Sequence, residues 1–84
     1  MSHQSQPKAI EAVILTLLEE RGAGKSICPS DAARRFDPEN WRAKMPEVRE
    51  AAARLTAKGE LVCTQKGQPV DVRTVRGPIR LRRP

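Results

Sequence analysis

Two cysteines, Cys28 and Cys63, carry the most reactive side chains of this 84-residue sequence. A structural zinc site needs four ligands at close spacing, and the sequence adds only one histidine, His3, to these two thiols. A cysteine nucleophile also needs a base beside it, and His3 stands in an N-terminal stretch that we expect to be flexible. Both cysteines are therefore predicted to be small, reduced core residues, with no metal and no other cofactor.

A glycine-rich segment, Gly22-Ala23-Gly24-Lys25-Ser26, has the composition of a phosphate-binding loop. That motif needs a further glycine where Glu19 stands, and it should follow a strand and open a helix. Here a helix is predicted before the segment and a short strand after it, so we assign Gly22 to the end of the helix. No set of acid, base and nucleophile can be assembled elsewhere, and we expect no enzyme.

The basic residues are a stronger candidate, because they concentrate toward the C-terminal end. Sixteen Lys and Arg against ten Asp and Glu give a net charge of +6, of which residues 1–64 contribute +1 and residues 65–84 contribute +5. Such an excess suits a partner that carries phosphates, provided that the guanidinium groups line up along one ridge beside the third helix. The candidate nucleic-acid-binding residues are Lys66, Arg73, Arg76, Arg80, Arg82 and Arg83, assisted by Arg49 and Arg54.

Two alternatives stay open for the charged residues. Arginines on an edge strand can simply keep that edge from pairing with other chains. The third helix is a weak surface for reading bases, because Glu47 and Glu50 would repel phosphate, and a solvated face is the simpler interpretation. Glu50 and Arg54 are also spaced to pair with each other at i, i+4.

The helices that must position these residues are predicted from apolar spacing and capping residues. Apolar residues recur at helical spacing over residues 8–21, and a second helix over 32–36 follows the capping sequence Pro29-Ser30-Asp31. Residues 37–41 resemble a capped turn. Pro46 is predicted to open the third helix, which runs to Lys58 before Gly59 ends it.

Extended segments complete the pattern. Residues 26–28 form a short strand, residues 61–65 alternate apolar and polar side chains, and a second extended stretch covers 70–75. Residues 79–82 alternate apolar and basic side chains. The order of helix, strand, helix, helix, strand, wing and strand predicts an α+β winged helix, a three-helix bundle with a small antiparallel sheet.

Aromatic side chains are too few to stack the bases of a single strand. Trp41 and Phe36 are the only aromatic residues, and both are expected in core or interhelical packing. Duplex DNA is therefore the nucleic acid that the sequence favours.

Several short motifs are distributed over nearly the whole chain. They are residues 28–34, Trp41-Arg42, Met45-Pro46, Val48-Arg49, Arg54-Leu55 with Gly59, Val70-Asp71 and residues 77–81. In these motifs the chain resembles the small bacterial winged-helix-like family known as domain of unknown function 3253. The resemblance implies a winged-helix fold and no defined activity.

The sequence as a whole predicts a single non-catalytic domain over residues 7–82, between a flexible N-terminus at 1–6 and a basic tail at 83–84. Duplex DNA is the favoured partner. A protein partner that docks near Trp41, Met45 and Arg49 is the alternative. No export signal, membrane span or small-molecule substrate is inferred, and with reduced cysteines a cytoplasmic location is expected. No long extra helix is predicted that could form a dimer seam, so a monomer is expected.

Overall fold

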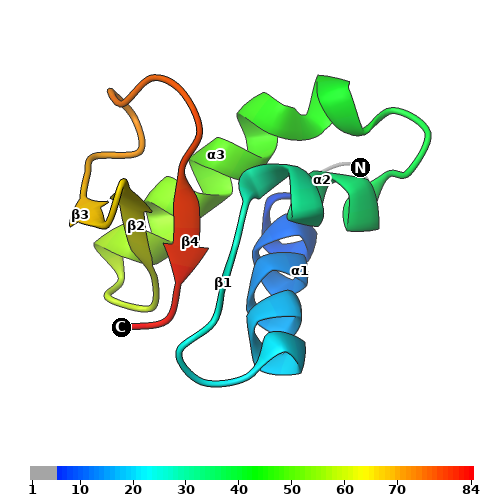
Figure 1. The fold of residues 1–84 in the computed structure, drawn as a ribbon. Coiled ribbons are helices and arrows are strands. Elements are labelled where there is room, and N and C mark those ends of the chain that lie inside the picture. Colours follow the sequence, from blue (N-terminus) through cyan, green and yellow to red (C-terminus); the bar gives the residue numbers. More distant parts are fainter. Residues whose placement is uncertain (1–5) are drawn as a thin grey trace.

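A computed structural model describes residues 6–84, which form three helices and a four-stranded antiparallel sheet (Figure 1). This arrangement confirms the predicted α+β, winged-helix-like fold. Residues 1–5, including His3, lie outside the described part, and Gln6 already belongs to the first helix. In chain order the elements are α1 (Gln6–Arg21), β1 (Ser26–Ile27), α2 (Pro29–Phe36), α3 (Trp41–Ala57), β2 (Val62–Gln65), β3 (Gln68–Pro69) and β4 (Arg80–Arg82).

The hydrophobic core lies between the three helices and the inner face of the sheet. The apolar stripe predicted for the first helix is buried as expected, and the alanines of α3 let that helix approach its neighbours closely. The largest fully buried side chains are Ile10, Ile14, Leu18, Ile27, Val48, Leu55, Cys63, Ile79 and Leu81.

Glycines end two of the helices, as the sequence predicts. Gly22 has a φ of 97° and its N–H donates to the carbonyl of Leu18. At the end of α3, Gly59 has a φ of 78° and donates to Thr56, while Glu60 donates to Leu55. This pair of hydrogen bonds is a Schellman motif, which needs a residue that tolerates the left-handed conformation.

The start of α3 differs from the prediction. The helix begins at Trp41, so Pro46 is its sixth residue and not its first. Proline lacks the N–H that would bond to the carbonyl of Arg42, and it disfavours helical geometry at the preceding residue. The helix nevertheless continues, because Trp41 and Met45, one turn apart, both pack against the core.

The sheet has the strand order β1-β4-β2-β3, which places β4 in its interior. β4 pairs on one side with β1, with Leu81 opposite Ile27, and on the other with β2, with Leu81 opposite Cys63. These three side chains form a buried row that faces the helices. The assumption that the arginines of residues 79–82 lie on an edge strand is therefore wrong.

The wing is mostly irregular. β2 and β3 form a hairpin through Lys66-Gly67, whose φ angles of 54° and 81° are those of a type I′ turn. The predicted strand over 70–75 is absent: Asp71 accepts hydrogen bonds from the backbone N–H of Thr74 and Val75, and residues 72–74 form a turn. The side chain of Asp71 also accepts from the N–H of Arg73, and this local bonding competes with strand formation.

Among residues 6–84, no helix combines the length and the apolar character needed to cross a membrane.

Candidate nucleic-acid interface

The outer face of the sheet presents two of the predicted arginines. Arg80 and Arg82 flank the fully buried Leu81 on β4, so both side chains leave the strand on the face away from the helices. Positions two residues apart on a strand are separated by about 6.8 Å, so the two side chains leave the strand side by side. Neither arginine lies within 4.0 Å of a carboxylate oxygen in residues 6–84.

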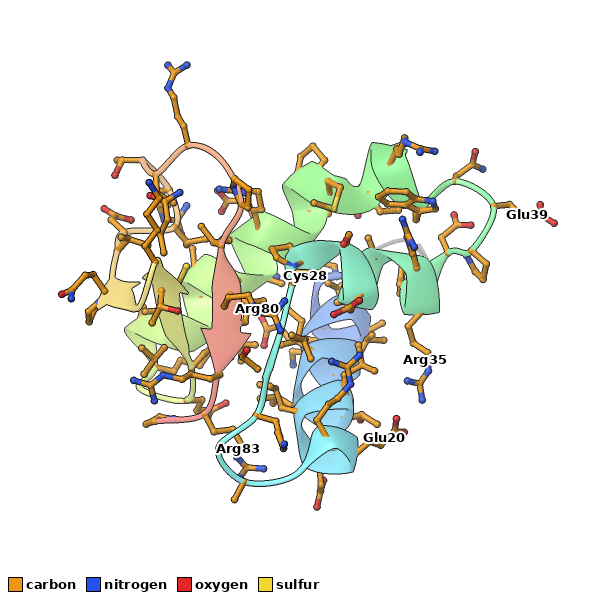
Figure 2. The ribbon with its side chains drawn as sticks, viewed as in Figure 1. Glu20, Cys28, Arg35, Glu39, Arg80 and Arg83 are labelled. Carbon is orange, nitrogen blue, oxygen red and sulfur yellow. The ribbon has the colours of Figure 1, made fainter. Side chains whose placement is uncertain are left out.

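Hydrogen bonds hold Arg80 in place. Its Nε donates to the hydroxyl of Ser26 at 3.0 Å, and one Nη donates to the Ser26 carbonyl at 3.1 Å. Figure 2 shows the Arg80 side chain reaching from β4 across β1. Arg80 thus ties β1 to the sheet while its guanidinium remains exposed.

Two further predicted cations lie at the hairpin end of the sheet. Lys66 occupies the tip of the β2-β3 turn and is exposed. Next to it, the side-chain amide of Gln65 donates to the carbonyls of Arg76 at 2.6 Å and Pro78 at 3.2 Å. These bonds fix the backbone of Arg76 beside the hairpin, so Lys66 and Arg76 belong to the same end of the sheet as Arg80.

Arg82, like Arg80, makes a hydrogen bond within the fold, from one Nη to the carbonyl of Arg83 at 3.1 Å, and three further predicted arginines are bonded to other elements. Arg73 bonds to the carboxylate of Glu50, and Nε of Arg54 lies 2.7 Å from a carboxylate oxygen of Glu11. These two pairings differ from the sequence expectation, in which Glu50 pairs with Arg54. Arg49 is half-buried and donates to the carbonyl of Val75 at 3.1 Å, which joins α3 to the wing.

Arg83 lies apart from the wing. It lines a surface hollow together with its neighbour Arg82, with Glu19 and with the turn between α1 and β1, and Figure 2 shows it at that end of the molecule. The eight predicted residues therefore do not form one ridge. Lys66 and Arg76 lie at the hairpin end of the sheet, and Arg80 and Arg82 lie on its outer face; we refer to these four residues together as the sheet-wing surface.

A second basic cluster escaped the sequence prediction. The guanidinium carbons of Arg34 and Arg42 lie 4.3 and 4.4 Å from the centroid of the Trp41 ring, at the corner between α2 and α3. Nearby, the ammonium of Lys44 lies 5.9 Å from the Phe36 ring. The sequence does show basic residues on both sides of the two aromatic rings. Which of them contact a ring depends on how the turn between α2 and α3 folds.

Burial, hydrogen bonds and nearby charges together set the pKa of Asp31, and Arg80 is one of those charges. Partial burial would raise the pKa of Asp31, but hydrogen bonds from Cys28 and the charges of Arg21 and Arg80 outweigh it and leave the pKa below its ordinary value. The N–H of Cys28 donates to Asp31 at 3.0 Å, which is the return bond of a capping box at the start of α2. Asp31 thus stays ionised and contributes to the helix cap.

The family assignment follows from the comparison with family models. The family described as protein of unknown function (DUF3253) matches residues 7–84, nearly the whole chain. The chain belongs to the DUF3253 family. No match was found among the curated proteins. The family description names no activity, so the function of this DUF3253 domain has to be argued from its surface.

The cysteines of the DUF3253 domain differ from each other. Cys63 is buried as predicted, and its burial raises the pKa of the thiol. Cys28 is only half-buried; it precedes α2, and its Sγ lies 2.9 Å from the hydroxyl of Ser30. Both thiols are free. Within residues 6–84, no three His, Cys, Asp or Glu side chains come together as a metal site.

Proposed function

We propose that this domain is a non-catalytic module that binds duplex DNA through contacts to the phosphate backbone. The contacts are made by the sheet-wing surface, that is by Lys66, Arg76, Arg80 and Arg82. Backbone contacts of this kind supply affinity and position a protein on the duplex without selecting a base sequence.

The interior position of β4 is the observation that carries the proposal. Arginines on an edge strand protect that edge from pairing with other chains. β4 is paired on both sides, so Arg80 and Arg82 have no edge to protect. Two exposed guanidinium groups at successive outward positions instead offer a pair of strong phosphate donors.

The conformation of Lys66 supports the proposal independently. A φ of 54° is unfavourable for lysine by about 1 kcal/mol, and type I′ turns prefer asparagine or glycine at this position. A strained residue at an exposed hairpin tip is consistent with selection for its charge over its conformation. The tip extends the sheet-wing surface beyond the ends of the strands.

Fluorescence anisotropy with a labelled duplex of random sequence tests the proposal. If four cations meet phosphates, log K should fall with log salt with a slope of about −3.6. The double substitution Arg80→Gln and Arg82→Gln should weaken binding and reduce the slope to about −1.8. A matched control is Lys8→Gln with Arg35→Gln, which removes the same charge from α1 and α2.

Equal weakening by the two double variants would show that only net charge matters and would remove the sheet-wing surface from the proposal. Absence of duplex binding by the unmodified domain at low salt would overturn the function altogether.

The alternative of a protein partner docking near Trp41 gains no support from a specific contact. Trp41 and Met45 are half-buried and pack against the core, and Arg34 and Arg42 cover the Trp41 ring. Arg49, the third residue of that surface, is bonded to the wing.

A further inference from the structure

The corner between α2 and α3 holds two arginines around one aromatic ring. Arg34 is the sixth residue of α2, and Arg42 is the second residue of α3. Both are exposed, while Trp41 between them is half-buried. Since each guanidinium carbon lies within 4.4 Å of the ring centroid, the two are less than about 9 Å apart.

Neither guanidinium has a carboxylate partner within the described residues. Other arginines of the helices do: Arg35, the neighbour of Arg34, forms two hydrogen bonds with Glu20, at 3.2 and 2.8 Å. The nearest acids in sequence are engaged or turned away. Asp37 accepts the N–H of Asn40 at 3.1 Å, and Glu39 points outward from the turn (Figure 2).

We propose that Arg34 and Arg42 form a phosphate anchor that contacts neighbouring phosphates of one DNA strand. This inference rests on the proposed function and adds a second contact region to it. A strand carries one phosphate per ~3.4 Å of helix axis, so two guanidinium groups less than about 9 Å apart can meet adjacent phosphates. Trp41 holds both groups in place, which limits the rotamer freedom that they lose on binding.

The ring of Trp41 is not a platform for a base. Its π-system already contacts both guanidinium groups, so a stacked base would have to displace a cation. The anchor therefore contacts the backbone and leaves the bases unread.

One residue of the anchor lies on the same helix that holds the wing. Arg42 lies in the first turn of α3, and the wing is bonded to the same helix at Arg49. Seven residues of helix span about 10 Å. The anchor and the contact with the wing are therefore about two turns apart on α3. The positive end of the α3 dipole adds to the attraction at the anchor.

Trp41 is the only tryptophan of the chain, so its fluorescence reports on this corner alone. Titration of the unmodified domain with the random duplex should change the Trp41 emission, with the same midpoint as the anisotropy change. The double substitution Arg34→Gln and Arg42→Gln should lower the affinity about tenfold and make the salt slope less steep by about 1.8.

The matched control is Lys8→Gln with Arg35→Gln, which also removes two positive charges, one of them the neighbouring arginine that is bonded to Glu20, and should leave the affinity within about twofold. Circular dichroism establishes that each variant is folded. Even if the double variant does not fold, the Trp41 emission of the unmodified domain still tests the proposal.

The outcomes separate the anchor from the proposed function. Duplex binding with unchanged Trp41 emission, or with full affinity in the folded double variant, would overturn the anchor and leave the sheet-wing surface standing. No duplex binding at all would overturn both. A Trp41 response to polyglutamate but not to the duplex would overturn the anchor by identifying the corner as a docking site for an acidic protein.

Discussion

One Nη of Arg73 lies 2.7 and 2.8 Å from the two carboxylate oxygens of Glu50. The contact joins the wing to the exposed face of α3, and both side chains are about half exposed. An exposed ion pair contributes little to stability, at most about 1 kcal/mol. It does, however, cancel a positive charge that would otherwise face a polyanion.

The first prediction is that Glu50→Gln strengthens duplex binding. The substitution removes a negative charge and releases the Arg73 guanidinium, so the affinity should rise about threefold and the salt slope should steepen by about 0.9. Anisotropy titrations at several salt concentrations measure both. Glu47→Gln is the matched control, because it removes an exposed carboxylate of the same helix without freeing Arg73. An equal gain from both variants would mean that Arg73 takes no part.

The second prediction concerns Lys66. Asparagine adopts the left-handed conformation more readily, so Lys66→Asn should raise the free energy of unfolding by about 0.5 kcal/mol and Tm by about 2–4 °C. The same substitution should weaken duplex binding, since it removes the charge at the hairpin tip. Thermal denaturation and anisotropy on one sample test the trade-off. A loss of stability would show that the lysine makes contacts that outweigh its strain.

The third prediction is an acid-sensitive contact between α1 and α3. Glu11 accepts hydrogen bonds from Arg54 and Lys58, and its side chain is only 13% exposed. The Arg54 hydrogen bond is the main reason that the pKa of Glu11 lies below its ordinary value of 4.5, against the opposing effect of burial. A carboxyl group with a depressed pKa stabilises the fold above the pKa of the unfolded chain. That stabilisation disappears as pH falls through the lower, folded pKa.

Glu11→Gln should therefore cost about 1 kcal/mol at pH 7, and its difference from the unmodified domain should shrink below about pH 4. Urea denaturation at both pH values measures this. Glu39→Gln, a substitution in the exposed turn, is the control. A pH-independent difference would show that packing, and not charge, accounts for the loss.

The fourth prediction separates the two faces of β4. Leu81 is fully buried, and Leu81→Ala should destabilise the domain by about 2–5 kcal/mol. Arg82→Ala should cost less than about 1 kcal/mol because its side chain is exposed. Thermal denaturation should show a fall in Tm of at least about 8 °C for the first and of only a few degrees for the second. Similar losses from both substitutions would contradict the assignment of faces.

Local patterns in the sequence were sufficient for much of the fold. The apolar spacing of α1, the glycine stops at Gly22 and Gly59, and the alternation around Leu81 each depend on neighbours within a few residues, and the structure confirms them. The start of α3 was missed because Pro46 has a strong preference for the first helical turn. Only the packing of Trp41 on the core overrides that preference.

The surface was less predictable because charge pairing depends on contacts across the fold. Arg54 meets Glu11, 43 residues away in sequence, in place of its helical neighbour Glu50. Arg34 and Trp41 are close in sequence, but the turn between α2 and α3 decides that they touch. Local sequence patterns do not show such contacts. The count of arginines therefore overestimated the positive charge that a partner can meet.

The place of β4 in the sheet also has a consequence for how the domain is made. β1 and β2 have no bonds to each other and are joined only through residues 80–82. A nascent chain on the ribosome can bring its helices together first, but its early strands stay unjoined until this late segment emerges. β4 thus completes the sheet and at the same time forms the outer face that carries Arg80 and Arg82. A polypeptide whose synthesis is incomplete lacks that face.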